Sequence, residues 1–464
     1  MVGAVATAHA QTPTPDQQRL REIYQQLVEF NTTESSGNVT QAAQAMAARL
    51  KAAGFPDQDV RLVIPSGSPK KGNLIARIHG TGAQRPLLLL AHLDVVEAKR
   101  EDWTRDPFKL VEENGYFYGR GVADDKSMAA IFLEQFVRLK RENYRPNRDI
   151  ILALTADEEQ GGLSEFNGVE NLLQSNKELI NAEIAINEGG GGRIGENGKY
   201  ERITIQFSEK VYQDFRLQIT NPGGHSSIPQ PDNAIYHLSD ALAKIGRFQF
   251  PAKLSQGTRT YFDRVSRITP GQVGADMKAI LSDPPDAQAL ERLSAVPDIN
   301  AQLRTTCVAT MMDGGHAPNA LPQRARANVN CRILPGEPVQ DVEKTLARVI
   351  ADDKIAIAPV GHEVSSPPAP LSDDIMKPVE AIAAAMWPGV AVIPVMSAGG
   401  TDGRFLLNAG IRTYGVSGMV SPVVNGTHGL NERMRVASLY EGQEFLYRLT
   451  KALSSGVPAA ATKQ

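Results

Sequence analysis

The sequence has no apolar run close to the roughly 20 residues that cross a bilayer, so no membrane span is expected. Its formal net charge is only −3 at pH 7, without the basic excess that would favour nucleic acid or an anionic membrane surface. It shows no internal repeat and no collagen-like, coiled-coil or disordered bias. The remaining class is an ordinary globular protein, and 464 residues are enough for two domains with substantial cores.

Cysteine is also scarce, with two residues in the whole chain, and this number does not decide the redox compartment. Cys307 and Cys331 lie on two segments, 303–311 and 324–333, that we expect to pair as antiparallel strands. If the two cysteines are opposite each other, a disulfide can form in an oxidising compartment. Two buried free thiols are the alternative.

The first ten residues are uncharged and rich in small side chains, and they end in Ala8-His9-Ala10. This resembles the end of a secretory signal with an A-x-A cleavage site, although the basic start and much of the apolar part are missing. We therefore predict a truncated signal peptide at 1–10 and a periplasmic or secreted protein, with a cytoplasmic location as the alternative.

The order of strands and helices predicts the fold class. Up to about residue 209, buried strands alternate with helices, which is typical of a mostly parallel α/β sheet with helices on both faces. From about Lys210 the order becomes β-α-β-β-α-β around a helical stretch at 250–302, which indicates an inserted α+β domain. The predicted domains are a catalytic domain at 11–209 and 371–464, an inserted lid or dimerisation domain at 210–362, and a linker at 363–370.

The strongest chemical signal follows the apolar run 88–91, which ends in His92, with Asp94 two places on. Residues two apart in a strand face the same way, so these side chains can lie together. A metal-bound imidazole usually donates its other N–H to a carboxylate. We therefore interpret His92 as a metal ligand and Asp94 as the residue that orients it.

Further acids and a histidine follow the ends of later strands, where the ligands of open α/β sheets collect. Two imidazoles with three or four carboxylates suit a pair of divalent metals, zinc above all, about 3.5–4 Å apart. The residues that follow strand ends are His92, Asp124, Glu158, Glu159, Glu188, Asp402 and His428, of which Asp402 is expected to be structural and not a ligand.

Two other chemistries find no support in the motifs. The run Gly189–Gly192 lacks the lysine and the Ser/Thr of a phosphate-binding loop. Ser226 and Ser227 do not lie in a nucleophile-elbow sequence, which argues against a serine hydrolase.

Six short motifs occur in one order along nearly the whole chain. They are His92-x-Asp94, Gly119-Arg120-Gly121-x-x-Asp124-x-Lys126, Glu158-Glu159, Asn187-Glu188-Gly189-Gly190, Gly224-His225-Ser226 and His428-Gly429-x-Asn431-Glu432. Together they resemble the zinc-dependent exopeptidase family of glutamate carboxypeptidase, aminoacylase, acetylornithine deacetylase and succinyl-diaminopimelate desuccinylase. The Asn-Glu-Gly run resembles the carboxypeptidase-type members most.

The resemblance implies two zinc ions, with cobalt or manganese as alternatives. The implied ligands are Asp124 as the bridge, His92 and Glu188 on one ion, and Glu159 and His428 on the other. Glu158 would be the general base that takes a proton from the metal-bridging water, because a carboxylate bound to metal is too weak a base. A cis peptide after Asp124 is also implied.

Three residues of the inserted domain gain a role from the resemblance alone. His225 is expected to reach a metal site, its own or a partner subunit's, and to donate a hydrogen bond to the tetrahedral oxyanion. Asn319 and Arg332 are expected to hold the substrate's carboxylate, which Arg332 would grip through two hydrogen bonds. A homodimer through the inserted domain is the expected assembly.

The predicted activity is a di-zinc metallopeptidase or amidohydrolase that cleaves small peptides or N-acyl amino acids in a carboxypeptidase-like manner. A non-catalytic homologue that binds a metal or a ligand is the alternative, although every expected position is filled. A phosphoester hydrolase using the same two-metal logic is a third interpretation, and no phosphate-binding motif supports it.

Overall fold

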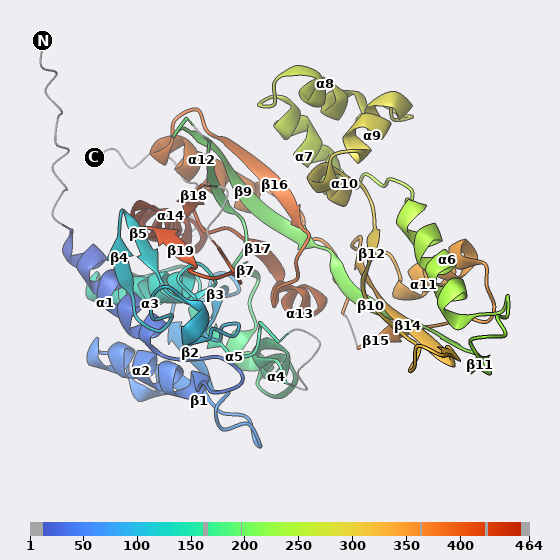
Figure 1. Cartoon of the computed structure of the whole chain (residues 1–464). Helices are drawn as coiled ribbons and strands as arrows, with labels where there is room; N and C mark the ends of the chain where they lie inside the picture. Colours follow the sequence, from blue (N-terminus) through green and yellow to red (C-terminus); the bar gives the residue numbers. More distant parts are fainter. Residues whose placement is uncertain (1–12, 161–165, 196, 362–363, 423–425, 456–464) are drawn as a thin grey trace, which may run out of the picture. The chain divides into compact units, whose positions relative to one another are not determined.

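The computed structural model describes residues 13–160, 166–195, 197–361, 364–422 and 426–455 (Figure 1). The predicted signal segment at 1–10 lies outside these residues, as does the first residue of the predicted linker. No helix among the described residues combines the length and the apolar character that a membrane span needs. The described residues divide into two compact units, one formed by those within 1–159, 178–180 and 418–457, the other by the rest of the described residues.

The first unit contains a sheet flanked by helices and a small three-stranded sheet. Its elements are α1 (Pro15–Glu29), α2 (Val39–Ala52), β1 (Val60–Val63), β2 (Asn73–Ile78), β3 (Leu87–His92), β4 (Val111–Glu113), β5 (Tyr116–Tyr118), α3 (Lys126–Arg141), β6 (Ile150–Thr155), α5 (Lys177–Ile180), β18 (Val420–Ser421), β19 (Arg433–Arg435) and α14 (Val436–Ser454). Strands β1, β2, β6 and β3 are neighbours in that order, and β3 and β6 run parallel.

The middle of this sheet is apolar throughout. Every residue of β3 and of β6 is buried, which is expected of strands covered on both faces. Helix α1 begins at the predicted capping box, where Thr14 and Gln17 exchange side-chain and backbone hydrogen bonds. The buried core therefore fixes the carboxyl ends of β3 and β6, where the candidate ligands follow.

The second unit contains the remaining strands and helices. Its elements are α4 (Gly168–Ser175), β7 (Ile184–Asn187), β8 (Gly191–Ile194), β9 (Tyr200–Glu209), β10 (Val211–Thr220), β11 (Gly224–His225), α6 (Ala234–Arg247), α7 (Gln256–Ser266), α8 (Gly271–Ala279), α9 (Ala287–Ser294), α10 (Pro297–Leu303), β12 (Thr306–Gly314), β13 (Ala320–Leu321), β14 (Arg324–Ile333), α11 (Val339–Ile350), β15 (Ala356–Val360), α12 (Asp373–Met386), β16 (Ala391–Ser397), α13 (Gly403–Asn408) and β17 (Arg412–Gly415). Parallel ladders join β7 to β17 and β16 to β9. The predicted class, α/β with a large and mostly parallel sheet, is confirmed.

A four-stranded antiparallel sheet, in the order β12-β14-β10-β15, follows the predicted β-α-β-β-α-β pattern. One face packs on α6 and α11 through an apolar cluster that includes Phe215, Val329 and Leu346. Cys307 of β12 lies opposite Cys331 of β14, and the two form a disulfide. Of the two states that the sequence allowed, the structure therefore has the oxidised one.

The helical stretch α7–α10 has its own apolar cluster, which includes Phe262 and Leu303 and extends to Ile393 of β16. The side chain of Arg264 on α7 also donates to the carbonyl of Val392, at 2.8 Å. The two compact units are divided along a different line from the predicted catalytic and inserted domains, whose boundaries therefore stay a prediction.

Candidate metal centre

His92 is the last residue of β3, and its side chain is almost fully buried. Its Nδ1 lies 3.0 Å from the backbone carbonyl oxygen of Asp94. Because a carbonyl can only accept, Nδ1 carries the proton, which leaves a lone pair on Nε2 of the neutral imidazole. This Nε2 lies 3.1 Å from Oδ1 of Asp124. Both atoms can donate a lone pair to a metal, so His92 Nε2 and Asp124 Oδ1 are placed to bind one cation together.

Asp124 lies between two imidazoles. Its peptide bond to Asp125 is cis, as the resemblance implied. Whereas Oδ1 faces His92, Oδ2 lies 3.2 Å from Nε2 of His428. Each carboxylate oxygen therefore has its own imidazole partner, which is the arrangement expected of a carboxylate that bridges two cations.

Glu158 and Glu159 follow β6 in a turn that Asp94 holds. The Asp94 carboxylate accepts hydrogen bonds from the backbone N–H groups of Glu158 (3.3 Å) and Glu159 (3.0 Å). The sequence predicted that this carboxylate would orient His92, but its nearer oxygen lies 3.7 Å from Nδ1, and the Asp94 carbonyl is closer. The carboxylate therefore binds the two backbone N–H groups of this turn, and hydrogen bonds to an ionised carboxylate are among the strong ones.

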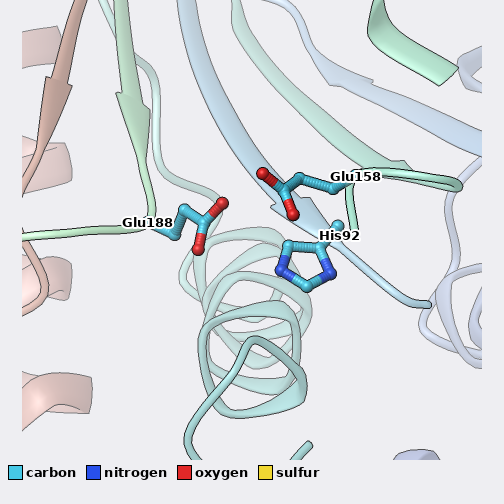
Figure 2. A group of neighbouring side chains, drawn as sticks. All are labelled: His92, Glu158 and Glu188. Carbon is cyan, nitrogen blue, oxygen red and sulfur yellow. The ribbon is translucent and has the colours of Figure 1, made fainter. Parts of the chain in front are cut away.

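Three side chains of the first unit have potential ligand atoms within 4.8 Å of one another. They are His92, Asp124 and Glu159. The Glu159 carboxylate also contacts Nε2 of His428 at 2.9 Å. Figure 2 shows the carboxylate of Glu158 close to the His92 ring, within the same unit; Glu188 belongs to the second unit, and its part in the metal site stays a prediction.

The electrostatics of His92, Asp124 and Glu159 suit a metal. Burial opposes ionisation of Asp124, but hydrogen bonds and the charges of His428 and His92 outweigh it and hold the pKa of that carboxyl well below its usual range. Hydrogen bonds with Asp124 and Glu159 raise the pKa of His428 to about 10. Within the described part of the chain, neither carboxylate has a lysine or arginine partner. The field that draws a proton onto His428 would equally draw a divalent cation, so the donor set fits a metal.

Glu432 supports the centre in a way that the sequence did not reveal. Its fully buried carboxylate accepts from the backbone N–H groups of Ala123 (2.7 Å) and Asp124 (3.2 Å), and from Nη1 of Arg120 (2.8 Å). It therefore ties the segment of His428 to the segment of Asp124. In the sequence, the only indication of this role was that Glu432 lies four residues after His428, a predicted ligand.

His225 and Asn319 lie together in the second unit. The backbone N–H of Ser227 donates to Nδ1 of His225 at 3.1 Å, so a neutral His225 carries its proton on Nε2. This is the tautomer that can donate a hydrogen bond to an oxyanion. The backbone N–H of Ser226 donates to the carbonyl of Asn319, also at 3.1 Å.

Arg332 lies on β14 of the four-stranded sheet, whereas His225 belongs to the separate two-stranded sheet of β11 and β13. Arg332 pairs with Tyr212 at the start of β10, whereas Asn319 precedes β14 at the end where Arg324 pairs with Thr220. At a rise of about 3.3 Å per residue, positions 324 and 332 are roughly 25 Å apart. Arg332 thus lies near one end of β14 and Arg324 at the other, and the binding of one carboxylate by both Asn319 and Arg332 stays a prediction.

The same chemistry is found in a known peptidase family. The profile of peptidase family M20/M25/M40 matches residues 88–452. The chain belongs to this family. Membership confirms the resemblance inferred from the six motifs and the predicted reaction class, a metal-dependent hydrolysis of amide bonds.

Among curated relatives, the M20 chain is 29% identical over 381 residues to the probable carboxypeptidase S-like 2 of Dictyostelium discoideum, covering 79% of this chain and 71% of that protein. It is 30% identical over 374 residues to the N-fatty-acyl-amino acid synthase/hydrolase PM20D1 of Homo sapiens, with coverage of 79% and 73%.

Solved structures share the fold of this M20 chain. The M20 family metallo-carboxypeptidase Sso-CP2 from Sulfolobus solfataricus superposes with a TM-score of 0.68 at 18% identity, covering 94% of this chain and 99% of that one. A tripeptidase from Staphylococcus aureus gives a TM-score of 0.64, also at 18% identity, with coverage of 95% and 99%. At these identities the likeness establishes the fold.

Proposed function

We propose that this protein cleaves the amide bond between an acyl group, or a peptide, and a terminal amino acid whose carboxylate is free. The observation that carries the proposal is the convergence of His92, Asp124, Glu159 and His428 without a fixed cation among the described residues. The names of two relatives, a carboxypeptidase S-like protein and an N-fatty-acyl-amino acid hydrolase, support this substrate class.

The proposed cofactor is a pair of zinc ions, with cobalt or manganese as alternatives. Asp124 would contact both ions, and the remaining ligands would be His92 and Glu188 on one side and Glu159 and His428 on the other. When bound, such ions supply the positive charge that acidifies water and polarises the scissile carbonyl. The chain must present neutral imidazoles and ionised carboxylates to the metal ions. The Asp94 carbonyl contributes to this because it fixes the tautomer of His92.

Glu158 is the proposed general base. It would take a proton from the attacking water and deliver it to the nitrogen of the departing amine. Its turn is anchored through the backbone N–H groups of Glu158 and Glu159, so the two neighbouring carboxylates can serve different tasks.

A homodimer is proposed for the complete site. His225 would donate from Nε2 to the oxyanion, and Asn319 would lie beside it, both in the active site of the partner copy. Arg332 would bind the substrate carboxylate in its own copy. Support comes from the roughly 25 Å of strand between Arg324, at the end of β14 that Asn319 precedes, and Arg332 in one chain.

A periplasmic or secreted location is proposed on the disulfide between Cys307 and Cys331, because such bonds persist in oxidising compartments. Thiol labelling of the denatured protein, taken from its native source with and without reductant, tests this. Labelling only after reduction is expected, and equal labelling in both samples would contradict the proposal.

The function is tested with zinc-loaded protein and a panel of dipeptides and N-acyl amino acids with acetyl, hexanoyl and lauroyl groups. Hydrolysis of at least one member, and none of its carboxamide counterpart, is the expected result. Hydrolysis of the carboxamides at equal rates would exclude the free-carboxylate requirement.

The variant Glu158→Gln separates an enzyme from a non-catalytic homologue. It should keep the metal content of the parent, measured by elemental analysis, while kcat falls about 10²–10⁴-fold because the base is lost. Glu142→Gln, at the residue that follows α3, is a matched control that should keep parental kcat. A parent protein that binds metal but hydrolyses no panel member would favour the non-catalytic alternative.

A further inference from the structure

The outer face of the four-stranded sheet carries a row of polar side chains next to Arg332. Tyr212 and Asp214 alternate along β10 with core residues such as Phe215, so they point away from the apolar cluster. In the ladder between β10 and β14, Tyr212 is opposite Arg332, and Asp214 is opposite Asn330. These four residues are thus two adjacent cross-strand pairs on one face.

The contacts within this row form a chain that ends at Arg332. The guanidinium carbon of Arg332 lies 4.6 Å from the centre of the Tyr212 ring, a cation–π distance. The Tyr212 hydroxyl donates to Oδ2 of Asp214 at 2.8 Å. Oδ1 of Asp214 accepts from the side-chain amides of Asn328 and Asn330, each at 2.9 Å.

Asp214 is therefore the fixed point of the row. Partial burial opposes its ionisation, but hydrogen bonds from Asn330, Asn328 and Tyr212 and the charge of Arg332 lower the pKa of Asp214 below its ordinary value. An ionised carboxylate with these donors holds the tyrosine hydroxyl in one place. The ring, which can rotate about only two side-chain bonds, is then fixed beneath the guanidinium.

A fixed platform matters because an arginine side chain loses much of its rotamer freedom when it is ordered. An arginine that is already ordered binds a planar carboxylate with less of this loss. Nη1 of Arg332 also donates to the carbonyl of Ala398 at 3.0 Å, which orients the plane of the guanidinium from a second side.

We propose that Asp214, acting through the ring of Tyr212, is a positioning residue that presents the guanidinium of Arg332 to the substrate carboxylate. The inference rests on the proposed function, in which Arg332 binds that carboxylate. Asp214 and Tyr212 then set the affinity for substrate and leave the chemical step to the metal centre. If the row only stabilised the sheet, its removal would lower the melting temperature without a selective change in KM.

The test uses steady-state kinetics on the panel member that the parent hydrolyses fastest. Asp214→Ala and Tyr212→Ala should each raise KM about 5–10-fold and change kcat less than twofold. The double variant should show no larger KM than Tyr212→Ala alone, because both changes act on one guanidinium. Tyr212→Phe keeps the ring and loses the hydroxyl, so a smaller rise of about 2–3-fold is expected.

Asp313→Ala is the matched control. Asp313 lies on β12 of the same sheet and pairs with Arg326, Nη2 to Oδ2 at 3.1 Å, outside the row of Asp214. Its KM and kcat should remain parental. If Asp214→Ala does not fold, Asp214→Asn keeps the shape of the side chain and removes its charge, with an expected rise in KM of about 2–5-fold.

The variant Arg332→Ala separates failure of this inference from failure of the proposed function. If Arg332→Ala raises KM by 20-fold or more while Asp214→Ala and Tyr212→Ala leave KM unchanged, the positioning role is wrong and the carboxylate anchor stands. If Arg332→Ala leaves KM unchanged, the anchor itself is wrong, and the positioning role fails with it. A fall in kcat at constant KM in the Asp214 variants would also overturn the inference.

Discussion

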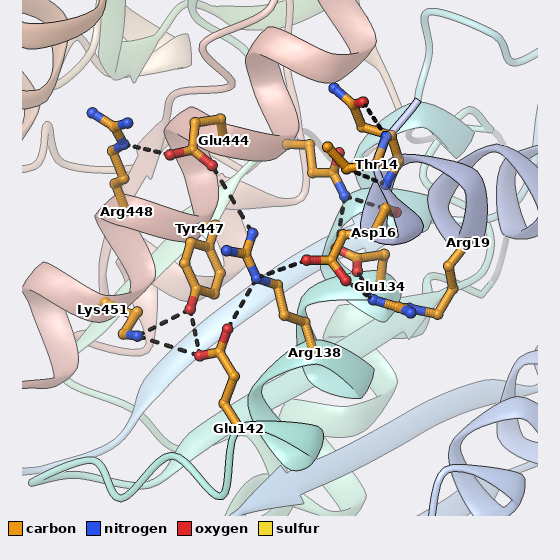
Figure 3. A network of polar contacts seen from close by, with 12 residues as sticks. Thr14, Asp16, Arg19, Glu134, Arg138, Glu142, Glu444, Tyr447, Arg448 and Lys451 are labelled. Atoms are coloured by element: carbon orange, nitrogen blue, oxygen red, sulfur yellow. Dashed lines mark hydrogen bonds and ion pairs between the residues drawn. The ribbon is translucent and has the colours of Figure 1, made fainter. Parts of the chain in front are cut away.

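Two clusters of charged side chains in the first unit differ in how their charge is balanced. The cluster between α1, α3 and α14 pairs each of its carboxylates with a fixed cation (Figure 3). Its charged members are Asp16, Arg19, Glu134, Arg138, Glu142, Glu444, Arg448 and Lys451. In the cluster of predicted metal ligands, the carboxylates of Asp124 and Glu159 form ion pairs only with imidazoles among the described residues. A group of acids is thus a candidate metal site when the fold supplies no arginine or lysine to neutralise it.

The largest effect is expected from Asp124→Ala, which removes the carboxylate shared by both imidazoles. The variant should lose bound zinc, measured by elemental analysis after desalting, and its activity should fall to background. Treating the parent with a chelator should do the same, and adding zinc should restore activity. Asp16→Ala, in the balanced cluster, is the control and should keep its zinc. Full zinc content in Asp124→Ala would contradict the assignment of the Asp124 cluster as the metal site.

A third way to accommodate a buried carboxylate is protonation, and Glu209 at the end of β9 illustrates it. Burial raises the pKa of Glu209 to about 7, although hydrogen bonds from Thr401 oppose this. Between pH 4.5 and pH 7 the folded state thus keeps a proton on Glu209 that the unfolded state releases. The contribution of protonated Glu209 to the free energy of unfolding is therefore complete below pH 4.5 and is lost as the pH rises through 7.

Glu209→Gln should therefore become more stable than the parent above pH 7, by about 3 kcal/mol at most, and should lose the advantage near pH 4.5. Thermal melting at pH 5 and at pH 8 measures the difference. Equal shifts in melting temperature at both pH values would show that the ionisation of Glu209 is not what couples stability to pH.

Glu432→Gln tests whether the clamp on the metal loop is needed for metal binding. An amide in its place would turn an N–H group toward donors such as the backbone of Ala123, so the loop of Asp124 should loosen. Substitution of residues that hold metal ligands in place typically lowers metal affinity by about 10–100-fold. Zinc affinity by competition with a chromophoric chelator measures the effect, with Glu142→Gln as the control. An unchanged affinity in a folded variant would limit Glu432 to a structural role.

The parts of this protein that follow from local pattern could be predicted from the sequence. The apolar runs of β3 and β6, the capping box of α1 and the motif positions of His92, Asp124 and Glu159 each depend on neighbours in the chain. Contacts between distant segments could not be predicted. The sequence does not show that Glu432 reaches the backbone of Asp124, because that hydrogen bond joins residues 308 positions apart.

A similar reason explains two features of the site. The Asp94 carboxylate, predicted to orient His92, lies 3.7 Å from its Nδ1 and also accepts from the N–H groups of the Glu158–Glu159 turn, which local spacing cannot reveal. Asn319 and Arg332 are close in sequence, yet an extended strand carries them apart. Closeness in the sequence therefore does not show how far apart two residues of a predicted site lie in the fold.

The smallest effect is expected in the balanced cluster itself. The Arg138 Nε contacts Asp16 at 3.3 Å and Glu142 at 3.1 Å, and the guanidinium carbon lies 3.5 Å from the centre of the Tyr447 ring. Arg138→Ala should lower stability by about 1–2 kcal/mol, because the two ion pairs are partly exposed and the stacking adds a similar amount. The melting temperature should therefore fall by a few degrees while kcat and zinc content remain parental. Arg138→Lys should restore little of this, since lysine lacks the planar fork that stacks on the ring and reaches both carboxylates. If Arg138→Ala instead bound zinc, loss of the guanidinium would have turned the balanced cluster into a metal site. The presence or absence of a fixed cation would then be enough to explain why one cluster binds metal and the other does not.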